Sequence, residues 1–316
     1  MNCLCCGKPL QEGEVKGWHK KCIKRFFGTS VLPEIKLDKE TLEQITKENT
    51  ENGYTVTGVQ KKLSLHLLSQ EEQPRLTLVN YPNGYILKPQ VPEFEALPEA
   101  EQLVMCMADA AGIATVPHAL IRADDQFAYI TKRIDRIIEK TGVRKIAMED
   151  FCQLDLRLTQ DKYRGSYERC AKVIERYSAQ RGLDMSELFI RLVFSFVVGN
   201  SDMHLKNFSL IESREGSSNY HLSQAYDLLP VNVIMPEDKE QLALTMNGKK
   251  MNLRKKDFLV FADHCEIPRK AAEKMMMKLV HMQPTFTNMC SESCLPEHMK
   301  ESLNALIEAR CRVIAG

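Results

Sequence analysis

The chain has 316 residues, of which 44% are apolar and 27% are charged, a balance typical of globular proteins. Its formal net charge of +1 at pH 7 excludes a general electrostatic attraction to nucleic acid or to an anionic membrane. No run of about 20 apolar residues is present, so the sequence predicts no membrane-spanning helix and no membrane partner. The length predicts about two domains, and the 11 scattered cysteines predict a reducing, cytoplasmic compartment.

The first predicted domain, residues 1–30, is a small cysteine-rich segment resembling a zinc knuckle. Cys3 and Cys6 form a C-x₂-C pair, and His19 and Cys22 form an H-x₂-C pair. Four nitrogen and sulfur ligands suit tetrahedral Zn²⁺, and a segment of this size needs such a cross-link because it cannot build a core alone. Cys5 is a rival ligand to Cys3 or Cys6, and a reduced, disordered tail is the alternative interpretation.

Residues 31–133 are predicted to form a strand-rich N-terminal lobe. After a helical or linking segment at residues 31–53, the apolar pattern predicts a helix at 99–111 and strands at 63–68, 75–79, 85–88 and 127–131. The turn residues Asn80–Gly84 predict a hairpin between the second and third of these strands.

Two features of this lobe could bind a nucleotide. The Thr55–Lys62 segment contains Gly58 and can present backbone N–H groups to phosphates, although an ordinary strand and turn is the alternative. Lys88 lies on an apolar strand, where a lysine can reach the α- and β-phosphates if a helix glutamate holds it. Glu101 is the expected partner and Glu99 the second candidate, whereas a solvent-facing lysine is the alternative.

Residues 134–316 are predicted to form a helical C-terminal lobe. Residues 186–198 are apolar nearly all round, which predicts a buried central helix, and residues 208–211 and 220–223 predict a short hairpin. The methionines at 275–277 are predicted to pack in a core. One basic run is predicted to be a solvated surface, with contact to a partner or an RNA substrate as the alternative: Lys249, Lys250, Arg254, Lys255 and Lys256.

The polar segment Gly199–Asn207 lies between the buried helix and the hairpin, and Asp227 follows the hairpin. Phosphoryl transfer needs a carboxylate that accepts the hydroxyl proton and oxygen ligands that hold Mg²⁺. We therefore expect Asp202 to be the base, and Asn207 and Asp227 to bind Mg²⁺. His204 could hydrogen-bond the base or the phosphate, and Lys206 could neutralise charge on the transferred group. A polar loop that only caps the helix is the alternative.

As a set, these features resemble the HipA family of serine/threonine protein kinases from bacterial toxin–antitoxin systems. The resemblance covers about residues 54–260 and rests on segments in family order: Thr57–Lys62, Ile86–Lys88, Lys132–Arg136, Met148–Gln153, Gly199–Ser209 and Tyr226–Leu229. The Asp-x-His-x-x-Asn pattern that begins at Asp202 is also similar to phosphatidylinositol kinases. The expected fold is therefore α+β and two-lobed, protein-kinase-like (HipA / phosphatidylinositol-kinase-like), with the small zinc-knuckle-like segment at the N-terminus.

The resemblance implies ATP and Mg²⁺ as cofactors and assigns roles by position. Asp202 matches the catalytic base, Asn207 and Asp227 match the Mg²⁺ ligands, and Lys88 matches the phosphate lysine. The hinge that meets adenine corresponds to Lys132, Arg133 and Ile134. The nucleotide loop corresponds to Thr57, Gly58, Val59, Gln60, Lys61 and Lys62. Family members autophosphorylate a serine just before the loop glycine, and Thr55 and Thr57 occupy these positions here.

The resemblance also implies partners. It predicts a protein substrate, of which aminoacyl-tRNA synthetases are the family examples, and small antitoxin partners, one of them DNA-binding. The chain itself is expected not to bind DNA sequence-specifically. It resembles the shorter, HipT-type members, because too few residues precede Thr55 for the extra N-terminal subdomain of longer members. The hinge has Lys132 and Ile134 where Glu and Phe are common in the family.

These observations predict an ATP- and Mg²⁺-dependent kinase that phosphorylates a protein Ser or Thr hydroxyl. A kinase acting on a lipid or small-molecule hydroxyl is the first alternative, motivated by the Asp-x-His pattern. A non-catalytic nucleotide-binding scaffold is the second alternative. The presence of Lys88, Asp202, Asn207 and Asp227 argues against a scaffold, which has no need of all four.

Overall fold

The protein, seen in a computed structural model, contains two compact units of mixed helix and sheet. The structure describes residues 2–11, 14, 16–34, 62–68, 75–77, 84–123, 126–139 and 142–316. The first unit comprises Met1–Gln102, Val116–Lys145 and Glu292–Cys294, and the second comprises Leu103–Thr115, Ile146–Ser291 and Leu295–Gly316. The α+β class is confirmed, and the predicted division into residues 1–30, 31–133 and 134–316 stays a prediction.

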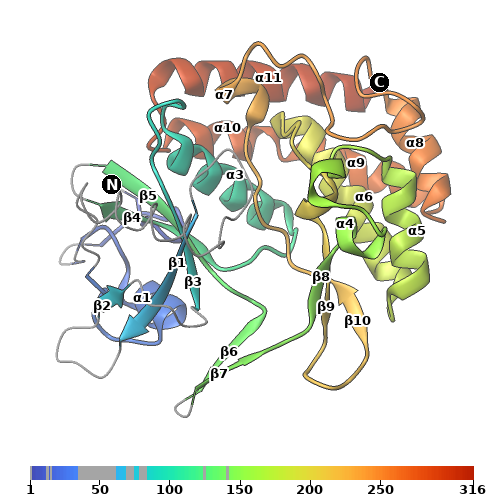
Figure 1. Ribbon diagram of the computed structural model, residues 1–316. Helices are drawn as coiled ribbons and strands as arrows, with labels where there is room; N and C mark the ends of the chain where they lie inside the picture. The colour runs from blue at the N-terminus through green and yellow to red at the C-terminus, as the bar shows by residue number, and fades with distance from the viewer. Residues whose placement is uncertain are drawn as a thin grey trace. The chain divides into compact units, whose positions relative to one another are not determined.

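The first unit is built on a five-stranded antiparallel sheet with strand order β2–β1–β3–β5–β4 (Figure 1). Its strands are β1 (Leu63–Leu68), β2 (Arg75–Thr77), β3 (Tyr85–Pro89), β4 (His118–Ala123) and β5 (Gln126–Lys132). β3 pairs with both β1 and β5, and four of its five residues are buried. The register places Lys88 opposite Tyr129 of β5. A separate hairpin consists of β6 (Arg136–Glu139) and β7 (Gly142–Lys145).

The predicted hairpin between β2 and β3 is wrong. Both strands pair with β1 instead, so β1 lies between them. The reason is that strand pairing follows from which apolar faces can be buried together, whereas turn residues in the sequence do not determine which strands pair. β1, with the sequence LSLHLL, places Leu63 and Leu65 in the buried core. It pairs with β2 along one edge and with β3 along the other.

Aromatic side chains join the N-terminal segment to this sheet. Helix α1 (Lys20–Phe27) buries Phe26 and Phe27, and Trp18 just before it is fully buried. The Trp18 ring lies 5.7 Å from the Phe26 ring and 5.5 Å from the Phe27 ring. Tyr85 of β3 lies 5.8 Å and 5.5 Å from the same two rings. Because buried aromatic pairs contribute both area and specific ring contacts, this cluster attaches α1 to β3.

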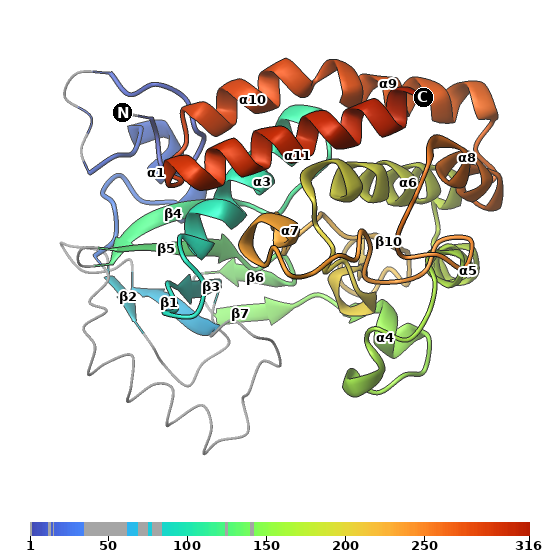
Figure 2. The ribbon, with the colours of Figure 1, turned by 90° about the horizontal axis from the view of Figure 1, so that it is seen from above.

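The second unit is mainly helical. Its helices are α4 (Phe151–Leu154), α5 (Tyr167–Tyr177), α6 (Arg181–Val198), α7 (Val231–Ile234), α8 (Lys255–His264), α9 (Arg269–His281), α10 (Gln283–Ser291) and α11 (Glu297–Ala315). Helix α3 (Leu97–Ala111) contributes its first residues to the first unit and the rest to the second. Figure 2 shows α9, α10 and α11 running beside one another, and α6 contacts both α9 and α11.

The predicted buried helix and the predicted hairpin are both confirmed. α6 begins earlier than predicted, at Arg181, and every residue from Leu188 to Val198 is buried. A small sheet with the order β10–β9–β8 contains β8 (Met148–Asp150), β9 (Ser209–Glu212) and β10 (Tyr220–Leu222). β9 and β10 form the hairpin, and all four residues of β9 are buried.

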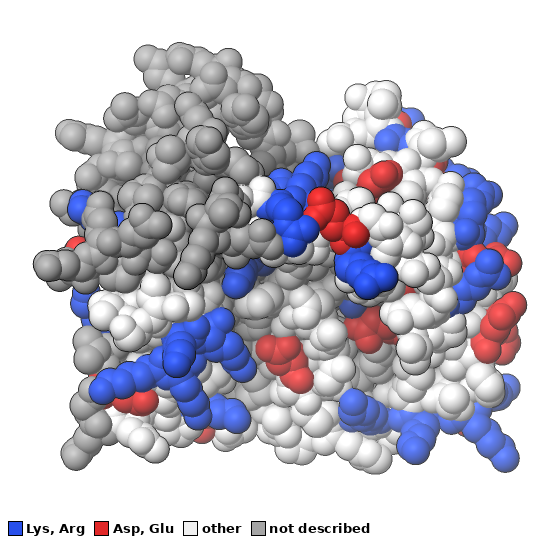
Figure 3. Space-filling view, turned by 90° about the horizontal axis from the view of Figure 1, so that it is seen from below, with Lys and Arg blue, Asp and Glu red and all other residues white. Residues whose placement is uncertain are grey.

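Charged side chains of both signs occur on the described surface. On the face in Figure 3, some Lys and Arg side chains lie next to Asp and Glu side chains, and others lie beside further Lys and Arg side chains. In the predicted basic run, Lys249 pairs with Asp257 at 2.8 Å and Lys250 with Glu240 at 3.0 Å. This pairing fits the solvated surface that the sequence predicts for the run. Within the described part of the chain, no helix combines the length and the apolar character needed to cross a membrane.

Candidate active site

A glycine ends the buried helix α6 and begins the polar segment 199–207. Gly199 has a left-handed φ of 72°, and a Cβ at this position would lie 2.8 Å from Leu306 Cδ2. Any other residue would therefore meet backbone strain, and the Leu306 side chain would have to shift. The chain then turns at Ser201 and Asp202 and forms a 3₁₀ helix, Leu205–Asn207, before it enters β9. Because the segment leaves a core helix and enters a buried strand, its polar side chains have defined positions.

Asp202 and Asn207 are held together by hydrogen bonds within this segment. Asn207 Nδ2 and the His204 backbone N–H both donate to the Asp202 backbone oxygen, each at 2.8 Å. The Asp202 N–H donates to Asn200 Oδ1 at 3.3 Å. Because the amide nitrogen of Asn207 points toward Asp202, its amide oxygen is the atom suited to a metal ion. The arrangement fits the predicted pair of base and metal ligand, and both roles stay predictions.

Tyr163 contacts Asp202, a contact that the sequence does not predict. Its hydroxyl donates to Asp202 Oδ1 at 2.7 Å, and its ring packs edge-on at 5.0 Å from the His204 ring. Burial, the hydrogen bond to Asp202 and the charges of Asp202, Asp227 and Asp238 raise the pKa of Tyr163. The hydroxyl therefore keeps its proton at neutral pH and donates. No motif marks Tyr163, because it lies 39 residues before Asp202 in the chain.

His204 and Lys206 have different surroundings. His204 is 6% exposed and precedes the 3₁₀ helix, where its ring meets Tyr163. Lys206 Nζ lies 2.6 Å from Asp150 Oδ2. Asp150 is also the N-cap of α4, where it accepts the N–H of Gln153 at 2.9 Å. Lys206 is thus held by an ion pair at the start of α4, and its predicted contact with the transferred group stays a prediction.

Asp227 follows β10 in the left-handed region, with φ of 62°. Asp tolerates this conformation better than branched residues, but it still costs free energy, which points to a requirement for this side-chain position. The adjacent Tyr226 hydroxyl donates to the Lys206 backbone oxygen at 3.1 Å and lies 2.6 Å from Ser209 Oγ. Tyr226 therefore attaches the backbone at Asp227 to the end of segment 199–207.

Three oxygen-bearing side chains thus gather in the second unit. Tyr226, next to Asp227, donates to the backbone oxygen of Lys206, which directly precedes Asn207. Asn207 is tied to Asp202 by its hydrogen bond. Two carboxylates and one amide oxygen are the donor types that Mg²⁺ prefers, so the residues present fit a magnesium site.

In the first unit, Lys88 and Glu101 form a buried ion pair. Lys88 Nζ lies 2.5 Å from Glu101 Oε1, and the two residues are 4% and 0% exposed. The Lys88 ammonium also lies 5.3 Å from the centre of the Tyr129 ring. The alternative of a solvent-facing lysine is therefore wrong. Glu99, the second candidate partner, has its pKa raised by burial. Because burying two charges is costly, a pair in this position is a candidate functional group.

The remaining predicted nucleotide contacts are only partly described. Thr55, Thr57, Gly58, Val59, Gln60 and Lys61 lie outside the described residues, and Lys62 is partly buried beside the start of β1. Lys132 ends β5, and its N–H donates to Pro117 O at 2.9 Å. The Arg133 guanidinium binds both oxygens of Asp135, at 2.9 and 2.8 Å, and Ile134 is partly buried. Their predicted contacts with adenine stay predictions.

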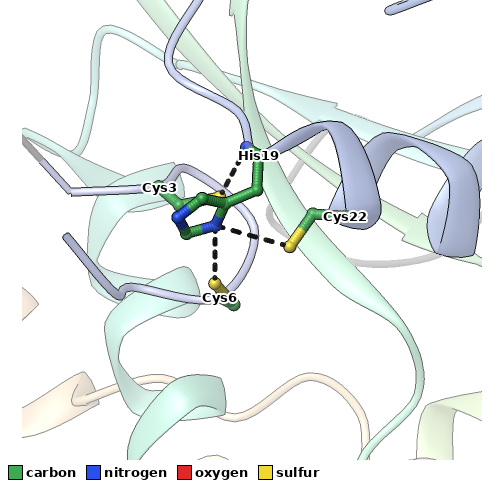
Figure 4. A group of neighbouring side chains, drawn as sticks. All are labelled: Cys3, Cys6, His19 and Cys22. Atoms are coloured by element: carbon green, nitrogen blue, oxygen red, sulfur yellow. Dashed lines mark hydrogen bonds between the residues drawn. The ribbon is translucent and has the colours of Figure 1, made fainter. Parts of the chain in front are cut away.

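The four predicted zinc ligands lie together (Figure 4). The ligand atoms of Cys3, Cys6, His19 and Cys22 are all within 4.8 Å of one another. His19 Nδ1 lies 3.4 Å from Cys6 Sγ and 3.8 Å from Cys22 Sγ. Ligand atoms around tetrahedral zinc are roughly 3.3–3.8 Å apart, so the set fits this metal. The Cys5 thiol instead lies 3.9 Å from the His118 backbone oxygen.

Comparisons with known proteins give a matching family and relatives that are named putative kinases. The family described as the HipA-like C-terminal domain matches residues 54–285. Two Sinorhizobium fredii proteins, named "Putative kinase Y4mE" and "Putative kinase Y4dM", are each 30% identical to this chain, over 64% and 69% of it. The chain spans 48% and 55% of their lengths. A Haemophilus influenzae protein named "Putative kinase" is 22% identical over 92% of this chain and 90% of its own length.

Two solved structures share the fold. One is described as the Shewanella oneidensis toxin–antitoxin system of HipA, HipB and operator DNA. It has a TM-score of 0.70 and 18% identity, and the match covers 87% of this chain and 70% of that chain. The other is the Helicobacter pylori proinflammatory kinase CtkA, with a TM-score of 0.53 and 14% identity over 80% of this chain and 95% of that chain.

Proposed function

The chain belongs to the HipA-like C-terminal domain family, and on this premise we propose that it is an ATP- and Mg²⁺-dependent kinase of protein Ser or Thr hydroxyls. The main support is that Asp202, Asn207 and Asp227 lie in one unit, on or bonded next to segment 199–207, where Tyr163 donates to the proposed base. The buried Lys88–Glu101 pair adds a candidate group for the nucleotide phosphates. The names of the three relatives and the two kinase-like folds agree with this proposal.

In the proposed reaction, Asp202 accepts the proton of the acceptor hydroxyl as its oxygen attacks the γ-phosphorus of ATP. The bond between this phosphorus and the bridging oxygen breaks, and ADP leaves with the electron pair. Tyr163 orients the Asp202 carboxylate, and Glu101 orients the Lys88 ammonium toward the α- and β-phosphates. Asn207 and Asp227 would hold Mg²⁺, which when bound neutralises charge on the phosphates.

The proposal includes partners. The Shewanella structure contains HipA with HipB and operator DNA, according to its description. By analogy, we propose that this chain acts with small antitoxin proteins, one of which binds DNA, and that its substrate is a protein. Aminoacyl-tRNA synthetases are the substrate class that the family resemblance suggests. The net charge of +1 gives the chain no general attraction to DNA, which fits DNA binding by a partner.

Autophosphorylation at Thr55 or Thr57 is part of the proposal. Protein produced in cells is expected to contain a species that is heavier by one phosphate, because Thr55 lies just before the proposed nucleotide loop and Thr57 is its first residue. Intact-mass measurement detects this species, and fragmentation locates the phosphate. A Thr55→Ala/Thr57→Ala variant is expected to show only the unmodified mass. A variant that still carries the phosphate contradicts this site, and an Asp202→Asn variant distinguishes self-modification from modification by a cellular kinase.

The proposed function is tested by incubating the full chain with ATP labelled on the γ-phosphate. We expect label to be transferred to a protein hydroxyl when Mg²⁺ is present, and transfer to stop when EDTA removes it. Binding of ATP without transfer to any acceptor would instead support the scaffold alternative. The Mg²⁺ requirement follows from the oxygen ligands Asn207 and Asp227, which suit this ion.

A further inference from the structure

The segments that carry the Cys3–Cys6–His19–Cys22 cluster are bonded to α3 and β3, the two elements that carry Glu101 and Lys88. Three of its members, Cys3, His19 and Cys22, are buried, and Figure 4 shows their side chains converging with that of Cys6. The backbone N–H of His19 also donates to Cys3 Sγ at 3.4 Å, and the ring nitrogen His19 Nε2 lies 3.0 Å from Pro9 O. The second contact orients the ring so that Nδ1 faces the thiols, which is the arrangement that a metal-binding imidazole needs.

The loop between Cys3 and Cys6 is bonded to helix α3 and strand β4. Gln102 Nε2 donates to the backbone oxygens of Leu4 and Cys5, at 3.3 and 3.1 Å. The Leu120 N–H of β4 donates to Leu4 O at 2.8 Å. Gln102 directly follows Glu101 in α3, and it is itself 6% exposed. The loop that carries two of the cysteines is therefore attached one residue away from the partner of Lys88.

Helix α1, which carries Cys22, is attached to strand β3. The Tyr85 hydroxyl donates to Phe26 O at 3.2 Å, and its ring contacts Phe26 and Phe27. Tyr85 is 1% exposed and lies on the same strand as Lys88. The two attachments thus reach both partners of the buried pair, Lys88 through β3 and Glu101 through α3. All of these residues belong to the first unit.

We propose that the cluster is a structural Zn²⁺ site that fixes the positions of β3 and α3 relative to each other. Zinc occupancy then determines whether the Lys88–Glu101 ion pair forms. Small segments with such ligand sets fold only when the metal is bound, because they lack a sufficient core. Loss of zinc therefore releases the Leu4 and Cys5 carbonyls and α1 from their partners. The metal part of this proposal is independent of the kinase assignment, whereas its effect on activity rests on the proposed function.

Trp18 offers a direct reporter for this test, because it is the only tryptophan of the chain and is fully buried beside His19. The purified full chain is expected to contain about one Zn²⁺ by elemental analysis. Phenanthroline, whose nitrogen ligands prefer Zn²⁺ to the hard Mg²⁺, removes the metal while Mg²⁺ stays available. We expect Trp18 emission to shift to longer wavelength, and re-addition of Zn²⁺ to reverse the shift.

Hydrogen exchange then shows whether the loss reaches the buried pair. In the zinc-free chain, the amides of 85–89 and 97–102 are expected to exchange at least about tenfold faster, while those of α6 are unchanged. Transfer of phosphate from ATP is expected to fall by at least about tenfold. If zinc is absent from the purified chain, or if 85–89 and 97–102 keep their protection after zinc removal, the proposal is overturned. Hydrogen exchange tests the zinc proposal even if the zinc-loaded chain transfers no phosphate. That absence of transfer would contradict only the proposed function.

Variants distinguish the effect of losing zinc from the effect of losing the bonds between the Cys3–Cys6 loop and α3. Cys3→Ser/Cys22→Ser is expected to lose zinc and to show the zinc-free exchange pattern, whereas the exposed Cys294→Ser serves as the matched control and keeps both zinc and activity. Because the double variant could fail to fold, Gln102→Ala provides a second test. It is expected to keep its zinc but to exchange faster at 97–102, since the bonds of Gln102 to Leu4 and Cys5, together with its contact to His118 Nδ1, are removed. Unchanged exchange in Gln102→Ala would contradict the attachment.

Discussion

An Asp202→Asn variant is expected to transfer phosphate roughly 10²–10⁴-fold more slowly than the wild type, because it loses the carboxylate that accepts the hydroxyl proton. The amide has the same shape and can still accept the Tyr163 hydroxyl at the Oδ1 position, so the fold of segment 199–207 is preserved. The KM for ATP is expected to change little, since Lys88 and the proposed Mg²⁺ ligands are retained. Steady-state kinetics with saturating ATP and Mg²⁺ measures both quantities.

Tyr163→Phe is the matched control for this variant. It removes the hydrogen bond to Asp202 but leaves the carboxylate, and Tyr163 is 44% exposed, so water can replace part of the lost contact. The loss of one such bond costs about 1 kcal/mol, which corresponds to a decrease of roughly fivefold in rate. An Asp202→Asn enzyme that is as active as Tyr163→Phe would contradict the assignment of the base.

The second large effect is expected at the buried ion pair. Lys88→Met leaves the Glu101 carboxylate buried after the loss of its cation, which is expected to lower the free energy of unfolding by about 3–5 kcal/mol. Transfer of phosphate is expected to be lost at the same time. Denaturant unfolding of the variant and the wild type measures the stability difference.

The double variant Lys88→Met/Glu101→Gln separates stability from function. With both charges removed, much of the stability is expected to return, because a neutral buried pair no longer requires compensation. Phosphate transfer is expected to stay low, because no ammonium is available for the nucleotide phosphates. If the double variant regained activity together with stability, the pair would be structural only.

Local patterns predicted the parts of the site that are contiguous in the chain. The buried helix α6 and the hairpin after it follow from apolar runs, and these two elements determine where the polar segment 199–207 lies. The partner of Lys88 was also predictable, because Glu101 lies on the next helix of the chain. The cysteine and histidine spacing likewise predicted the group that the structure brings together.

Contacts between distant segments were not predictable in the same way. The pairing of β2 and β3 with β1 depends on which apolar faces are buried together, which the Asn80–Gly84 turn residues do not encode. Tyr163 has no motif of its own and becomes visible only when the fold places its hydroxyl 2.7 Å from Asp202. The ion pair of Lys206 with Asp150, 56 residues earlier, depends on the fold in the same manner.

The identity of the phosphorylated acceptor tests the central proposal most directly. Wild-type chain and Asp202→Asn are incubated with ATP labelled on the γ-phosphate, Mg²⁺, a cytosolic protein fraction and phosphatidylinositol vesicles, and the label is counted separately in protein and lipid. The proposal predicts Mg²⁺-dependent label on Ser or Thr of protein with the wild type and almost none with Asp202→Asn. Label in the lipid alone, or equal protein labelling by both chains, would contradict it.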